Sequence, residues 1–128
     1  MTTAKLKVLI VDDDADLREI ISSHLKTVAD IIHTANDGQE AVKACRSVKI
    51  PYDVLLTDIM LPNQDGIQTI LKLRDEFPGM YIIAISGGRR TLTSDFTLQS
   101  ASLAGAHAVL SKPFTRDQLL GTIRQAGL

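Results

Sequence analysis

The hydrophobic positions of this chain fall into five short aliphatic runs separated by stretches with helical periodicity. The runs are Leu6–Val11, Ile31–Ala35, Val54–Thr57, Tyr81–Ile85 and Ala108–Leu110. Most of them are continuous rather than alternating, which is typical of strands that are covered on both faces. Each pair of successive runs is separated by enough residues for one helix.

Between the runs, apolar residues recur at the spacing of amphipathic helices. The predicted stripes are Leu17, Ile20, Ile21, Leu25 and Val28; Ala41, Val42, Cys45 and Val48; Ile67, Ile70, Leu71 and Arg74; and Leu119, Leu120 and Ile123. Asp14 is the expected N-cap of the first helix and Asn36 or Asp37 that of the second, whereas Pro78-Gly79 ends the third. A further helix is placed near Ser94–Ala104, although its apolar residues form no clean stripe.

The alternation of five strands with five helices predicts an α/β fold. Its sheet is expected to be parallel and doubly wound, with right-handed crossovers and helices on both faces. A chain of 128 residues is the size of one domain, so we expect a single domain over residues 1–128 and no separate output domain.

Net charge, cysteine content and the length of the apolar runs exclude several classes of protein for this chain. A net charge of -1 gives no whole-chain attraction to nucleic acid or to an anionic membrane. The single cysteine, Cys45, excludes an intrachain disulfide and a cysteine-rich zinc site, and it is interpreted as a small core residue. The chain has no signal-peptide pattern and no apolar run long enough to span a bilayer, so a soluble, cytoplasmic protein is expected.

Polar residues collect where the predicted strands end. Asp12 and Asp13 follow the first strand, Asp58 the third, Ser86 the fourth and Lys112 the fifth. Ligands of an open α/β sheet bind outside the carboxyl ends of its strands. Since these ends share one edge in a parallel sheet, we expect the five side chains to converge.

The converging side chains predict phosphoryl chemistry. Crowded carboxylates repel one another unless a cation joins them, and an oxygen-only ligand set suits Mg²⁺. A serine hydroxyl and a lysine ammonium are suitable partners for phosphoryl oxygens. A carboxylate can also act as a nucleophile and form an aspartyl phosphate. Asp58 is the best placed for that role, because it lies alone at the end of a central strand.

These residues resemble the receiver domain of response regulators in two-component signalling. The resemblance rests on VLIVDD at Val8–Asp13, LLTDIMLPNQDG at Leu55–Gly66, AIS at Ala84–Ser86 and SKPF at Ser111–Phe114. Each motif alone is weak, but all four occur in order and cover essentially residues 5–127. The resemblance implies a flavodoxin-like fold with strand order 2-1-3-4-5.

The resemblance also implies roles for individual residues. Asp58 matches the phosphoacceptor, Asp13 the carboxylate that binds the metal directly, and Asp12 the acid that holds metal-bound water. Met60 lies where a backbone carbonyl completes the coordination of the metal, which is expected to be Mg²⁺, with Mn²⁺ as an alternative.

Other matched positions surround the phosphoryl group. Lys112 matches the lysine that contacts it, and Ser86 fills the hydroxyl position. The Lys112–Pro113 bond matches one that is cis in the family. Pro62 and Gly66 match residues that shape the loop after the acceptor.

By resemblance, the protein is a phosphorylation switch that assists its own phosphorylation and dephosphorylation, rather than an enzyme. Its expected partners are a histidine kinase or histidine phosphotransfer protein and an unidentified downstream protein, without direct binding to nucleic acid or membrane. Receivers often carry Tyr or Phe three residues before the lysine. Here that residue is Val109, so relay through an aromatic ring cannot operate in its usual form.

Other functions remain open alternatives at this point. An Asp-nucleophile phosphatase would need a second acid where this chain has Met60. A flavodoxin-like cofactor binder is opposed by the acids after the first strand and by the few aromatic residues. A receiver-like interaction module that is never phosphorylated, and an isolated receiver cut from a longer regulator, both share the same motifs.

Overall fold

The computed structural model describes residues 5–59, 66–86 and 105–127, which contain five strands and four helices. In chain order these are β1 Leu6–Val11, α1 Ala15–Leu25, β2 Ala29–Ala35, α2 Gly38–Ser47, β3 Val54–Asp58, α3 Gly66–Glu76, β4 Tyr81–Ser86, β5 Ala108–Ser111 and α5 Arg116–Arg124. The five predicted strands are confirmed, and each observed strand contains its predicted run. None of the described helices reaches the length and apolarity that a membrane crossing requires.

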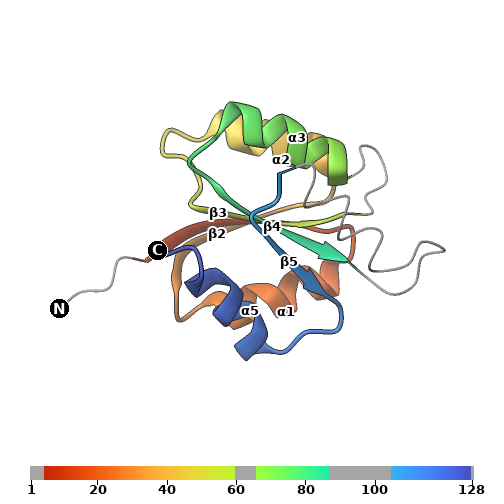
Figure 1. Cartoon of the computed structure of the whole chain (residues 1–128), viewed down its shortest axis with the longest axis vertical. Helices are drawn as coiled ribbons and strands as arrows, with labels where there is room; N and C mark the ends of the chain where they lie inside the picture. Colours follow the sequence, from red (N-terminus) through yellow and green to blue (C-terminus); the bar gives the residue numbers. More distant parts are fainter. Residues whose placement is uncertain (1–4, 60–65, 87–104, 128) are drawn as a thin grey trace.

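All strand pairs are parallel, and the sheet has the order β2-β1-β3-β4-β5. This order confirms the doubly wound, flavodoxin-like fold, with β3 at the centre and β2 and β5 at the edges. Helices α2 and α3 cover one face of the sheet, and α1 and α5 cover the other (Figure 1). Successive side chains of a strand point to opposite faces, so Leu55 packs on the α2 and α3 side and Leu56 on the α1 and α5 side.

Polar caps fix where the helices begin. The side chain of Asp14 accepts hydrogen bonds from two backbone N–H groups in the first turn of α1, as predicted. For α2 the structure decides between two candidates, because the Asp37 side chain is the one that accepts from the first turn, rather than Asn36. At α5, Thr115 and Gln118 form a reciprocal capping box that the sequence analysis missed.

Several helical positions differ from the prediction. Val28 and Val48 lie beyond the ends of α1 and α2, so they are not part of the helical stripes. Ile20 and Leu71 are each 51% exposed, because the sheet covers only one side of α1 and α3 and leaves their flanks in solvent. The helix predicted near Ser94–Ala104 falls outside the described residues.

His107, directly before β5, is bonded to β4 through both its backbone and its ring. Its backbone N–H donates to the carbonyl of Ile82 at 2.8 Å, and its ring Nδ1 accepts from the Ile82 N–H at 3.0 Å. The ring also stacks on Tyr81. A nitrogen that accepts a hydrogen bond carries no proton, so this geometry requires the neutral imidazole. Burial lowers the pKa of His107, and the positive charge of Arg74 lowers it further.

We expect this contact to make stability depend on pH. The unfolded chain binds a proton near the ordinary histidine pKa of 6.5, whereas the folded chain resists it. The stabilisation is therefore complete above pH 6.5 and is lost as the pH falls through the lower folded-state pKa. In His107→Asn the amide oxygen can accept the same bond but does not titrate. On acidification the wild-type free energy of unfolding should fall relative to this variant, by less than about 1 kcal/mol, the value of one net hydrogen bond, because His107 is exposed and solvent screens its charge. Urea unfolding across this pH range measures the difference, and parallel pH profiles would refute the effect.

Candidate functional site

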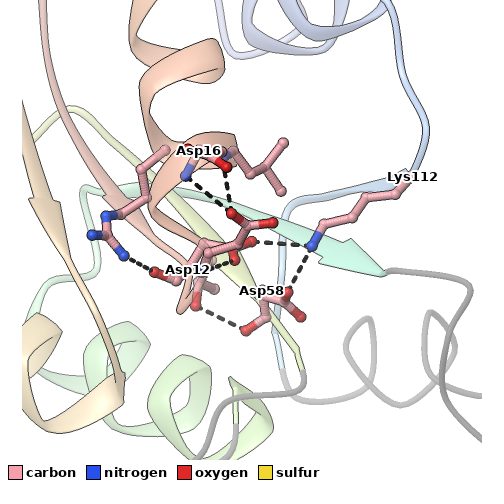
Figure 2. A network of polar contacts seen from close by, with 8 residues as sticks. Asp12, Asp16, Asp58 and Lys112 are labelled. Atoms are coloured by element: carbon pink, nitrogen blue, oxygen red, sulfur yellow. Dashed lines mark hydrogen bonds and ion pairs between the residues drawn. The ribbon is translucent and has the colours of Figure 1, made fainter.

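The carboxyl ends of four strands bring the predicted site residues to one edge of the sheet. Asp12 follows β1 directly, Asp58 is the last residue of β3, Ser86 the last of β4, and Lys112 follows β5. The backbone N–H of Lys112 donates to the carbonyl of Ser86 at 2.7 Å, which places these two residues side by side. Figure 2 shows the side chains of Asp12, Asp58 and Lys112 pointing toward one another.

The ammonium of Lys112 bridges the two carboxylates. Its Nζ lies 2.8 Å from Asp58 Oδ2 and 3.1 Å from Asp12 Oδ2. Asp12 is only 1% exposed and Asp58 5% exposed, so both carboxylates have lost most of their hydration. A buried carboxylate is costly unless a charge or hydrogen bonds compensate it. Lys112 supplies that compensation to both acids at once.

Burial and charge shift the acidity of this cluster. Burial raises the pKa of Asp12, and the nearby negative charge of Asp58 raises it further, against the opposing hydrogen bonds from Asp14 and Lys112. Burial alone would lower the pKa of Lys112. The hydrogen bond and charge of Asp58, together with Asp12, outweigh burial and raise the pKa of Lys112. The lysine therefore remains an ammonium at neutral pH.

Asp12, Asp13 and Asp58 together form a potential cation site. One carboxylate oxygen from each residue lies within 4.8 Å of the other two, and Asp13 is exposed to solvent. When all are ionised, these three carboxylates and the Lys112 ammonium leave two net negative charges. A divalent cation would neutralise them, and hard cations such as Mg²⁺ and Mn²⁺ prefer oxygen ligands. The residues present therefore fit such an ion. Met60, whose carbonyl was expected to complete the set, lies outside the described residues, as does Pro62.

The start of α3 packs against the backbone at the end of β3. The N–H of Gly66 donates to the carbonyl of Ile59 at 2.7 Å. A Cβ added to Gly66 would lie 2.3 Å from the carbonyl oxygen of Asp58 and 2.4 Å from the Cα of Ile59. A residue with a Cβ does not fit this close approach, which explains why glycine occupies the position that the motif resemblance singled out. The Lys112–Pro113 bond is cis, as predicted.

Arg18 is a residue of this site that the sequence analysis missed. Its guanidinium Nη1 donates to the backbone carbonyl of Asp12 at 2.7 Å. The sequence feature that could have identified Arg18 is its position one helical turn after the N-cap Asp14. Long helical side chains lean toward the N-terminus of their helix, so this side chain can reach the turn that precedes α1.

Comparison with known proteins identifies this arrangement. The model of the response regulator receiver domain family matches residues 8–124. The chain belongs to the response regulator receiver domain family. The chain is therefore a signalling receiver domain rather than a member of a typical enzyme family, and receiver domains bind Mg²⁺ at an acidic pocket.

Relatives of this receiver domain differ widely in length. It is 32% identical to the two-component response regulator ARR22 of Arabidopsis thaliana, over 92% of this chain and 81% of the relative. It is 33% identical to the transcription factor SKN7 of Chaetomium thermophilum, over 94% of this chain but only 15% of that protein. Among solved structures, the chemotaxis response regulator CheY4 of Vibrio cholerae is 28% identical, with a TM-score of 0.81 over 96% of this chain and 99% of the other.

Proposed function

We propose that Asp58 of this receiver domain accepts a phosphoryl group from the phosphohistidine of a histidine kinase or histidine phosphotransfer protein. The observation that carries the proposal is the environment of Asp58. Its carboxylate ends the central strand, contacts the Lys112 ammonium at 2.8 Å and faces the carboxylates of Asp12 and Asp13. Nucleophile, cationic partner and metal ligands thus converge on one point.

In this proposal, an Asp58 oxygen attacks the phosphorus as the bond to the donor nitrogen breaks. A divalent ion held by Asp12, Asp13, Asp58 and the Met60 carbonyl would neutralise charge on the phosphoryl oxygens. The Lys112 ammonium lies beside the Asp58 carboxylate and would pair with an oxygen of the phosphoryl group attached there. The buried position of Asp58 limits access of water to the acyl phosphate that results.

The new phosphoryl group would alter contacts at the ends of β4 and β5. Ser86 and Lys112 are joined through the backbone, and both are placed to bind the group. Their contacts would favour one arrangement of the surface formed by the last two strands and helices, to which a downstream protein would bind. Val109 in β5 is 39% exposed on that surface and takes the place of the aromatic residue common in receivers.

Because the domain itself supplies the catalytic groups, a small phosphodonor should suffice without a kinase. We expect acetyl phosphate with Mg²⁺ to add one phosphoryl group, detected by intact mass spectrometry. Chelating the metal with EDTA should lower the rate by at least about tenfold, because the carboxylates then repel the donor. Excess Mn²⁺ should restore the reaction. Failure of the wild-type protein to react, or a rate indifferent to EDTA, would count against the proposed metal-dependent transfer.

A further inference from the structure

Arg18 lies near the start of α1, yet its side chain reaches back to the turn that carries the acidic residues. Its Nη1 donates to the Asp12 carbonyl at 2.7 Å, and its backbone N–H bonds to the carbonyl of Asp14. The N-terminus of a helix carries partial positive charge and favours acidic side chains. An arginine here therefore does not stabilise the helix through its charge, and its contact with Asp12 calls for another explanation.

Hydrogen bonds with the end of β2, with α1 and its N-cap, and with the residue after β5 hold Asp12 in place. Its N–H donates to the Ala35 carbonyl at the end of β2, at 3.2 Å. Its Oδ1 accepts from the Asp14 N–H at 2.9 Å, and its Oδ2 from Lys112 after β5. Arg18 adds a bond from α1 to the carbonyl. That carbonyl belongs to the planar peptide group between Asp12 and Asp13, so a bond to it restricts the orientation of both residues.

We propose that Arg18 is a positioning residue for the divalent cation of this receiver domain. By holding the peptide plane between Asp12 and Asp13, it keeps both carboxylates directed toward Asp58. The bond from a guanidinium to a carbonyl is charge-assisted and directional, which suits this role. The inference rests on the proposed metal-dependent function.

The direction in which the affinity for the cation changes when Arg18 is replaced separates a positioning role from a purely electrostatic one. A positive charge close to a cation site weakens cation binding, so its removal should strengthen binding if charge alone mattered. If orientation of the carboxylates matters more, removal of the donor should weaken binding instead. A purely structural role would lower the stability of the fold and leave the affinity for the cation unchanged.

The test is Mg²⁺ affinity in Arg18→Met and Arg18→Lys at constant ionic strength, measured by calorimetry and by amide chemical shifts. Methionine keeps the apolar stem but has no donor, whereas lysine keeps a charged donor. We expect the Mg²⁺ dissociation constant to rise about fivefold in Arg18→Met, the value of one net hydrogen bond. Arg18→Lys should recover most of the loss. Urea unfolding without Mg²⁺ reports stability separately.

Arg74→Met is a matched control. It also removes a guanidinium that donates to a backbone carbonyl, that of Gly105, but near the end of α3 at the opposite edge of the sheet. Its Mg²⁺ affinity should equal that of the wild type. Unchanged or tighter binding in Arg18→Met, or an equal loss in Arg74→Met, would overturn the role of Arg18. Failure of the wild type to bind Mg²⁺ would instead overturn the proposed function.

Discussion

Replacing Asp58 with asparagine is expected to abolish the phosphoryl adduct that acetyl phosphate and Mg²⁺ form on the wild-type protein. The amide has nearly the same shape as the carboxylate but is not a nucleophile of comparable strength. Lys112 still has Asp12 as an ion-pair partner in this variant, so the lysine is not left buried without a counter-charge. Intact mass spectrometry should show no adduct under conditions that fully modify the wild type.

Two further aspartates serve as controls for this experiment. Asp75→Asn makes the same change on the exposed surface of α3 and should react like the wild type. Asp13→Asn removes one carboxylate of the cation site but keeps Asp58, so the adduct should form only at higher Mg²⁺ concentration. An adduct in Asp58→Asn, or a phosphopeptide that maps to Asp12 or Asp13, would show that Asp58 is not the acceptor.

Replacing Gly66 with alanine is expected to damage both the stability and the chemistry. The added Cβ would lie far inside contact distance of backbone atoms of Asp58 and Ile59, which cannot rotate away as a flexible side chain could. Overpacking of this kind destabilises proteins by about 1–3 kcal/mol. Because the displaced atoms include the backbone of Asp58, the proposed acceptor, the rate of phosphorylation should fall as well.

Gly121 in α5 provides the comparison for Gly66. Apart from its chain neighbours and the backbone of its own helix, no described atom lies within 4 Å of a Cβ built on Gly121, and the residue lies inside a helix. Gly121→Ala should therefore leave phosphorylation unchanged and stabilise the protein by up to about 1 kcal/mol through helix propensity. Urea unfolding and the initial rate with acetyl phosphate measure both effects. If Gly66→Ala proves as stable and as reactive as Gly121→Ala, the close approach at Gly66 is not a constraint.

The strands were the most predictable part of the fold, because continuous aliphatic runs are a local signal of a strand buried on both sides. Val54–Thr57 and Tyr81–Ile85 lie at the centre of the sheet and match this expectation closely. The helix stripes were less accurate at Ile20 and Leu71, which lie beside the buried positions Ile21 and Ile70 but face solvent. Periodicity shows that a helix has an apolar face, but only packing sets the width of that face.

The composition of the candidate site was also predictable. Acids after the first and third strands and a lysine after the fifth can be read directly from the chain, and parallel strands bring their ends to one edge. The resemblance to the receiver motif identified Gly66 as a residue that shapes the loop after Asp58. No pattern in the sequence indicated that the Cα of Gly66 lies so close to the carbonyl of Asp58 that a Cβ would not fit.

The sequence by itself determined the five strands, the parallel sheet and the residue types at its functional edge, because these follow from local periodicity and from the residues at strand ends. Only the tertiary structure decided how those residues connect. Lys112 bridges Asp12 and Asp58 across separations of 100 and 54 residues, and Arg18 bonds to the carbonyl of Asp12 rather than to a carboxylate. Such contacts depend on the distances and burial that packing of strands and helices creates, and no local pattern in the chain encodes them.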